Sequence, residues 1–296
     1  MAGARGSRQR RGPRRESAPA PIVLDPTWQS PYSPTAEERD HHAKALKRYL
    51  WQWRRSRLVL AGVVVVALLA ASFVHWWFSL FALVVIAVSA VDTQVSLSRA
   101  LNSEGAMAAR LLDHFTPASD PTARVRVTTL VERLGATFGV DGVSSFVVSD
   151  PVYNAALVPN GTGLSLFVTD ALVRDFELIE FEGVLAHLFA RTRVGVLERQ
   201  VAAALLDLTE ERRRTLAGSG LLYRCDEVGA AQIRYPLGLS GALRRCAAQD
   251  ATSAYFSSEQ YRSERSVWFD AHSDRAEAEL SDLDDATLRA MALEEW

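Results

Sequence analysis

The strongest constraint in this sequence is the run from Leu58 to Val91, which contains no Asp, Glu, Lys or Arg. A membrane-spanning helix needs about 20 apolar residues and can manage with about 17, so this run is too long for one ordinary span and suffices for two short ones. We therefore predict a transmembrane helical hairpin over residues 58–91. Its turn is expected between Ser72 and Trp77, because His75 and Trp76 prefer the membrane interface. One long tilted span is the alternative.

The residues just before this run form a basic and aromatic collar, which we predict to be an interfacial segment over residues 43–57. Cytoplasmic flanks carry the excess of Lys and Arg, so the collar is expected inside the cell, and two spans would return the chain there. The sequence thus predicts a multi-pass protein of the cell membrane, with the lipid bilayer as a partner and the large domain in the cytoplasm. A single span would leave that domain outside. The collar residues are Lys44, Lys47, Arg48, Trp51, Trp53, Arg54, Arg55 and Arg57.

The start of the chain is rich in Arg, although the net charge is only −2. Residues 1–42 combine Arg, Pro, Gly and Ser without apolar periodicity, which is typical of a disordered tail. The arginines could adhere to anionic lipid headgroups. Nucleic acid is not expected as a partner, because aromatic or structured support is absent from this segment. The only cysteines, Cys225 and Cys246, lack the paired spacing of a zinc ribbon or a redox motif.

Residues 92–296 are predicted to form one soluble α+β domain around a buried helix between Phe176 and Gly195. Apolar residues in this stretch recur at i, i+3, i+4 and i+7, the period of a helix with one apolar face, and Gly195 is placed to end it. A strand is expected from Leu164 to Val168, after a turn at residues 160–163. The periodic residues of the helix are Phe181, Val184, Leu185 and Leu188.

The first half of this helix resembles the zinc-binding helix of the HtpX-type membrane metallopeptidases. Glu180-Phe-Glu-Gly-Val-Leu-Ala-His187 is similar to the family's lead-in to its His-Glu-Leu-Ala-His sequence, and Asp150-Pro-Val-Tyr-Asn-Ala155 resembles the family's Asp-Pro-x-x-Asn-Ala. Residues 225–243 and 269–283 resemble later family segments in the same order. The resemblance implies a zincin-like metallopeptidase domain, with helices packed on a small mixed sheet, that follows two membrane spans and lies in the cytoplasm.

The metal site itself departs from the family pattern. In His-Glu-x-x-His two histidines bind zinc and the Glu is the general base. Here His187 keeps the first ligand position, Leu188 stands at the position of the base, and Arg191 stands at that of the second ligand. Leu cannot move a proton, and Arg offers no lone pair to a cation. The family's third ligand, a Glu four residues before an Asp, falls on Leu222 or Tyr223. We therefore expect no intact catalytic residue, no metal and no other cofactor; were zinc bound, His187 would be its ligand.

These departures predict a membrane-anchored, catalytically inactive metallopeptidase homologue, a pseudoprotease that acts as a protein- or peptide-binding or regulatory module. Its partner would be another membrane protein or a cytoplasmic protein, and the resemblance points to protein quality control. Two other functions stay open. One is an active membrane zinc metalloendopeptidase with an unorthodox site, and the other is a purely structural membrane protein. The sequence does not indicate the oligomeric state.

Two expectations concern the site in detail. Zinc would tie the central helix to a later carboxylate segment, so we predict that Arg191 restores this link by a salt bridge to Asp226 or Glu227. In metallopeptidases of this fold an edge strand offers its open backbone groups to an extended peptide. The strand at that place in the order consists of Leu164, Ser165, Leu166, Phe167 and Val168, which we predict to be the peptide-binding edge.

Overall fold

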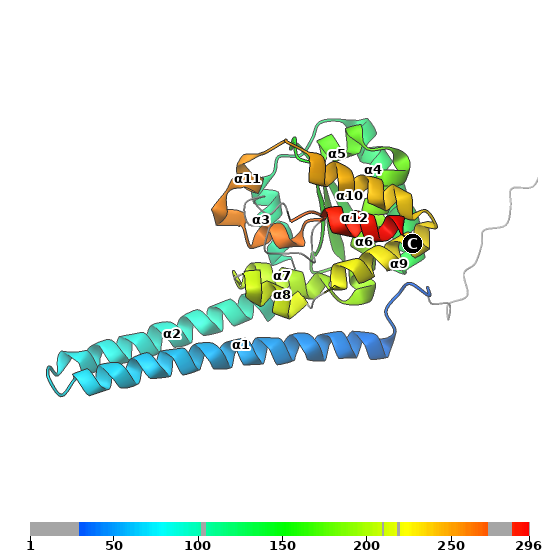
Figure 1. Cartoon of the computed structure of the whole chain (residues 1–296). Helices are drawn as coiled ribbons and strands as arrows, with labels where there is room; N and C mark the ends of the chain where they lie inside the picture. Colours follow the sequence, from blue (N-terminus) through cyan, green and yellow to red (C-terminus); the bar gives the residue numbers. More distant parts are fainter. Residues whose placement is uncertain (1–29, 102–104, 209, 218–219, 272–285, 296) are drawn as a thin grey trace, which may run out of the picture.

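The computed structural model consists of a long helical hairpin and an α+β domain (Figure 1). It describes residues 30–101, 105–208, 210–217, 220–271 and 286–295. The hairpin projects from one side of the domain, and the last helix, drawn in red, lies on the domain. Most of the segment predicted as a disordered tail, residues 1–29, lies outside the described residues.

Two antiparallel helices, α1 (Ala36–Ala71) and α2 (Trp77–Leu101), form the hairpin. Residues 72–76 make the turn between them, as the sequence predicts. Arg57 of α1 pairs with Asp92 of α2, and these two residues flank the uncharged run at its start and at its end. This ion pair therefore marks the base of the uncharged part of the hairpin.

One helix of the described residues is long and apolar enough to cross a membrane, namely Trp77–Ser98 within α2. The uncharged part of α1 runs only from Leu58 to Ala71, which is shorter than the about 20 residues of an ordinary span, because the turn takes up the middle of the run. Many large apolar side chains of both helices are exposed, including Val66 and Phe81. Such a surface is typical of a segment that meets lipid or another protein. A crossing by both helices stays a prediction.

The predicted boundary of the tail at residue 42 is wrong, because α1 already begins at Ala36. Thr35 and Glu38 close a capping box, in which the Glu38 amide donates to the Thr35 hydroxyl and the Thr35 amide donates to the Glu38 carboxylate. Just before it, the hydroxyls of Ser30 and Ser33 donate to backbone carbonyls at the end of a helix of the domain. The composition of this polar stretch does not reveal the start of the helix, because a capping box depends on the spacing of two residues.

Three strands form a mixed sheet in the order β1–β3–β2. Strand β1 runs parallel to β3 with Val143 opposite Leu164, and β2 runs antiparallel to β3 with Ala155 opposite Val168. Their bounds are β1 (Val143–Val148), β2 (Ala155–Pro159) and β3 (Leu164–Thr169). The predicted peptide-binding edge, Leu164 to Val168, is therefore wrong: β3 is the central strand, and its backbone groups are taken by a neighbour on each side.

Helices of the same domain pack around this sheet (Figure 1). The longest of them, α4 and α6, form much of the main core with the sheet. The helices of the domain are α3 (Ala106–His114), α4 (Pro121–Phe138), α5 (Asp170–Asp175), α6 (Leu178–Val194), α7 (Leu197–Leu205), α8 (Glu210–Ala217), α9 (Leu221–Ile233), α10 (Pro236–Ala248), α11 (Ala254–Ser257), the short 3₁₀ helices η1 (Glu259–Tyr261) and η2 (Glu264–Val267), and α12 (Ala286–Glu294).

Helix α6 is the buried centre of the domain, as the apolar period of its sequence predicts. Every residue from Gly183 to Arg191 is buried. The helix begins with a capping box between Glu177 and Glu180 and ends at Gly195, whose φ of 73° lies in the left-handed region that favours glycine. Because burial covers the whole circumference, α6 has neighbours on all sides rather than one apolar stripe.

The base of the hairpin packs directly on the domain. Leu50 and Trp53 of α1 are buried against Ala202, Ala203 and Leu206, which belong to α7 and the residue after it. The base of the hairpin is thus fixed against the domain, whereas the uncharged part projects beyond it (Figure 1).

The predicted α+β class is confirmed at the level of architecture, namely helices packed on a small mixed sheet. The closer likeness to a zincin fold stays a prediction. The distinction matters for the site, because a general α+β domain does not by itself imply a metal centre.

Candidate functional site

Helix α6 carries the two polar side chains at the centre of the domain, His187 and Arg191. They lie four residues apart and therefore on the same face of the helix, and both are fully buried. The Arg191 Nε donates to His187 Nε2 at 3.1 Å. The intervening Leu188 turns away into the apolar core, also fully buried.

Helix α9 brings Asp226 to the other side of His187. The carboxylate lies 2.6 Å from His187 Nδ1 and is also fully buried. This approach depends on Gly229, because a Cβ there would lie 2.9 Å from the backbone nitrogen of His187. A glycine at this position lets the backbones of α9 and α6 come close enough for the pair to form.

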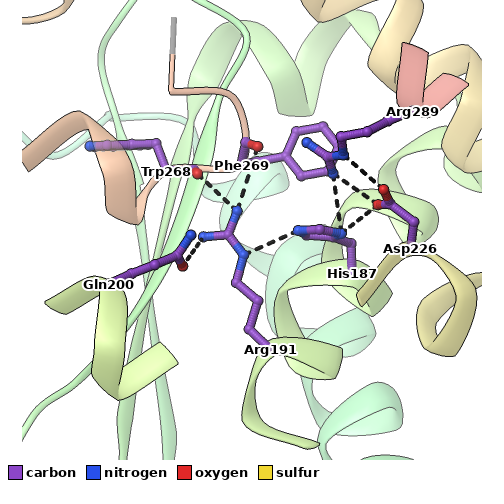
Figure 2. Close-up of polar contacts among 7 residues, drawn as sticks. All are labelled: His187, Arg191, Gln200, Asp226, Trp268, Phe269 and Arg289. Atoms are coloured by element: carbon purple, nitrogen blue, oxygen red, sulfur yellow. Dashed lines mark hydrogen bonds and ion pairs between the residues drawn. The ribbon is translucent and has the colours of Figure 1, made fainter. Parts of the chain in front are cut away.

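Arg289 of α12 completes the anionic side of the cluster. Its Nε and Nη2 donate to the two oxygens of Asp226 at 2.7 and 2.8 Å, which is a bidentate pair. The guanidinium also lies over the ring of Phe269, 5.5 Å from its centroid. Figure 2 shows the Asp226 carboxylate facing both Arg289 and His187.

These surroundings fix the charges of the cluster. Burial lowers the pKa of His187 to about 3, although Asp226 opposes the shift. Burial alone would raise the pKa of Asp226, but Arg289 and His187 outweigh it and hold the value at about 2. His187 is therefore neutral and Asp226 ionised at neutral pH.

The partners of His187 also assign its tautomer. A neutral imidazole has one donor and one acceptor nitrogen, so Nδ1–H donates to Asp226 and the lone pair of Nε2 accepts from Arg191. Arg289 Nη2 lies 3.3 Å from Nδ1, but this contact is not a hydrogen bond because Nδ1 carries the proton. Both ring nitrogens of His187 are thus used by other side chains.

The far end of the Arg191 guanidinium ties α6 to two other segments (Figure 2). Nη1 donates to the Gln200 side chain of α7 at 3.0 Å and to the Val267 carbonyl at 2.7 Å. Nη2 donates to the Trp268 carbonyl at 2.9 Å and to the Phe269 carbonyl at 3.5 Å. The guanidinium therefore binds consecutive carbonyls of the chain at the point where η2 ends.

This segment, residues 267–270, lies along the outer edge of β2. Trp268 forms an antiparallel bridge with Ala156, and the Phe269 amide donates to the Ala155 carbonyl at 2.7 Å. The side chain of Asn154 binds both backbone groups of Asp270, donating to the carbonyl and accepting from the amide. The chain itself thus occupies the free edge of the sheet next to Arg191.

The predicted link from Arg191 to the 225–231 segment is wrong. Asp226 is bound by His187 and Arg289, while Glu227 lies on the surface and pairs with Arg224. The cation that Asp226 needs comes from α12, so Arg191 is directed to the opposite side, toward the 267–269 carbonyls. The segment link exists, but His187 and Arg289 provide it.

Sequence reasoning missed several members of the cluster. Arg289 lies in a helix near the end of the chain that carries no motif, and Gln200 lies in an apolar stretch. The carbonyls of residues 267–269 have no signature in side-chain patterns at all. His272, which belongs to a segment that resembles the family, lies outside the described residues.

The cluster leaves no free lone pair on the His187 ring. The neighbouring thiol of Cys225 is buried, and burial raises its pKa to about 12, so it stays protonated and unreactive. Within the described ranges, no three His, Cys, Asp or Glu side chains gather as a metal site would require. The described residues around His187 therefore do not fit a zinc ion, and what they form is an ionic network. No protein-family model matches the chain, and no curated protein matches it.

Proposed function

We propose that this chain is a membrane-anchored, non-catalytic relative of the HtpX-type metallopeptidases, in which a guanidinium has replaced the metal as the tie between elements. It would serve as a protein-binding or regulatory module rather than as an enzyme. The domain is held by its α1–α2 hairpin at the membrane surface, on the side that the basic collar predicts to be cytoplasmic.

The observation that carries the proposal is the contact between Arg191 Nε and His187 Nε2. A histidine can bind a metal only through a free lone pair, and here a permanently protonated side chain occupies the one that His187 has left. Arg191, which stands at the second metal-ligand position of the resembled motif, thus blocks His187 at the first position.

The pairing of His187 with Asp226 supports descent from a metal site. Metal-binding histidines usually donate their other ring N–H to a carboxylate, which fixes the tautomer and the ring orientation. The Nδ1–H of His187 makes this contact at 2.6 Å. The arrangement is what remains when the supporting carboxylate is retained and the ligands beyond it are lost.

A second support comes from the segment at the outer edge of β2. Extended peptides bind to proteins by adding a strand to an open sheet edge. Here the Trp268 segment of the chain itself takes that edge, and Arg191 holds its carbonyls. A partner protein would therefore bind elsewhere on the domain, not as a strand in this groove.

The test is metal analysis and a peptidase assay on the intact protein purified in a mild detergent. We expect substoichiometric zinc, no cleavage of unfolded protein substrates, and no response to chelator. The double variant Leu188→Glu/Arg191→His, which rebuilds the motif, should also be inactive. Stoichiometric zinc with chelator-sensitive cleavage by the unmodified protein would instead support an active enzyme with an unorthodox site.

A purely structural role and a regulatory role differ in whether the domain binds a specific partner protein. A regulatory module needs a specific protein in stoichiometric amount, whereas a structural protein does not. Chemical cross-linking in intact membranes, followed by identification of proteins joined to the domain, separates the two. Cross-links confined to lipid or to copies of the same chain would favour the structural role.

A further inference from the structure

One face of α1 stays unused at the base of the hairpin. Trp51, Arg54, Arg55, Leu58 and Val59 follow one another at i, i+3, i+4, i+7 and i+8, so they share one side of the helix. They line a shallow hollow on it. All five are exposed, and we call this surface the collar face.

The collar face points away from the domain. On the opposite side of the same helical turns, Leu50 and Trp53 are buried against α7. Packing of the domain therefore explains why α1 is apolar on one side, but it does not explain the aromatic and aliphatic side chains of the collar face. Trp51 exposes 60% of its surface and Val59 exposes 58%.

The two arginines of this face have no anionic partner among the described residues, whereas Arg57 on the flank is paired with Asp92. The Arg55 guanidinium lies over the Trp51 ring, 5.6 Å from its centroid. Stacking of this kind uses the flat face of the guanidinium and leaves its N–H groups in the plane free to donate. Arg54 and Arg55 thus present adjacent forks of donors, which suit the oxygens of a phosphate.

The position of the face along the hairpin defines the rest of the ligand. Leu58 is the first residue of the uncharged run, and the Arg57–Asp92 pair marks the same level on both helices. Four residues of helix rise separate Arg54 from Leu58, about 6 Å along the axis. The hollow therefore has a cationic end toward the start of α1 and an apolar end toward the uncharged part of the hairpin.

We propose that the collar face binds one anionic phospholipid, with its headgroup phosphate at Arg54 and Arg55 and its acyl chains along Leu58 and Val59. The proposal rests on the membrane anchoring stated above and adds a lipid specificity to it. A zwitterionic lipid would bring a second cation close to two unpaired guanidiniums, which disfavours it. Two basic residues at an anionic surface predict a preference on the order of tenfold or more.

The experiment is native mass spectrometry of the intact chain in a neutral detergent, titrated with phosphatidylglycerol or with phosphatidylcholine of the same acyl chains. We expect one phosphatidylglycerol to bind at least tenfold more tightly than phosphatidylcholine. The variant Arg54→Gln/Arg55→Gln should lose this preference. The matched control Arg124→Gln/Arg234→Gln, which removes the same charge from exposed positions of the domain, should keep it.

Equal binding of the two lipids, or an equal loss of preference in the control variant, would overturn the proposal. A third arm adds millimolar inorganic phosphate. If free phosphate abolishes the preference, the headgroup alone is recognised and the apolar half of the site is refuted. Resistance of the wild-type protein to carbonate extraction from membranes is measured separately. A protein that stays in the membrane but shows no lipid preference refutes only the lipid site, whereas one that is extracted refutes the anchor.

Discussion

Replacing Arg191 by Met tests the central cluster most directly. Met has a similar length and fills much of the same space, but it has no donor. The change leaves five buried acceptors without their present partner, namely His187 Nε2, Gln200 Oε1 and the carbonyls of Val267, Trp268 and Phe269. Water does not readily replace the lost donor, because Arg191 is fully buried and each of these neighbours is more than nine-tenths buried.

The expected cost follows from these contacts. Each buried acceptor left unsatisfied costs about 1–3 kcal/mol, but removal of Arg191 also ends its repulsion with Arg289 and the burial of a charge. Breaking a buried ionic network by removing one member typically costs about 3–5 kcal/mol, and we expect a loss of unfolding free energy in that range. For a domain of this size the midpoint of thermal unfolding should fall by roughly 6–20 °C.

Two measurements check this expectation on the intact chain in detergent. Thermal unfolding followed by tryptophan fluorescence gives the midpoint, and hydrogen exchange of the peptide around Phe269 reports its amide, which donates to Ala155. The control is Arg193→Met on the same helix, where the lost partner is the partly exposed Glu38 and the cost should be at most about 1 kcal/mol. Equal midpoints for the two variants, or unchanged exchange at Phe269, would refute the conclusion that Arg191 holds these segments together.

Three other predictions concern the pH dependence of stability, the packing of α9 on α6, and the topology of the hairpin. The lowered pKa values of His187 and Asp226 mean that the unfolded chain binds more protons than the folded chain. The free energy of unfolding should therefore be full above pH 6.5 and fall with acidification by at most about 1.4 kcal/mol per pH unit for each proton. A thermal unfolding midpoint that does not move between pH 7.5 and 5, or that falls equally in His187→Gln, would contradict this. Gly229→Ala should destabilise the domain by about 1–3 kcal/mol because the new methyl group meets the α6 backbone, whereas Gly241→Ala, which meets only a flexible carboxylate, should cost little in the same unfolding assay. A cysteine introduced at His75 should react with membrane-impermeant maleimide in intact cells, because the hairpin turn is expected outside and the native cysteines are buried; labelling only after permeabilisation would contradict the two-span topology.

Local patterns in the sequence identify the elements of this protein well. The charge-free run gives the hairpin, and its interfacial residues place the turn. The apolar period and Gly195 give both ends of α6 to within two residues. These features depend only on near neighbours in the chain, which is the information that periodicity and capping residues carry.

Long-range pairing is where the sequence is insufficient. The turn at 160–163 indicates that β2 and β3 pair. Strand β1 precedes β2 in the sequence but pairs with β3, and no residue pattern indicates this crossover. The prediction that Arg191 pairs with Asp226 or Glu227 fails for the same reason. Helical spacing correctly brings Arg191 beside His187, but the carbonyls at 267–269 and the cation of Arg289 converge only when distant segments fold together.

The geometry of Arg191 also explains why two substitutions should not restore a metal centre. A zinc ion gathers its ligand atoms within about 2.0–2.3 Å, whereas a guanidinium spreads donors over a plane and bonds acceptors at about 3 Å. The elements around Arg191 are therefore spaced for a larger, flat cation. Its acceptors at Val267 and Trp268 are backbone carbonyls at the end of η2, in the segment that covers the outer edge of β2. A histidine at position 191 would be too short to reach those carbonyls, and their desolvation would oppose folding before any metal could bind. Return to a metal site would require displacing the segment at the β2 edge and supplying a third ligand on α9, in addition to changing the motif.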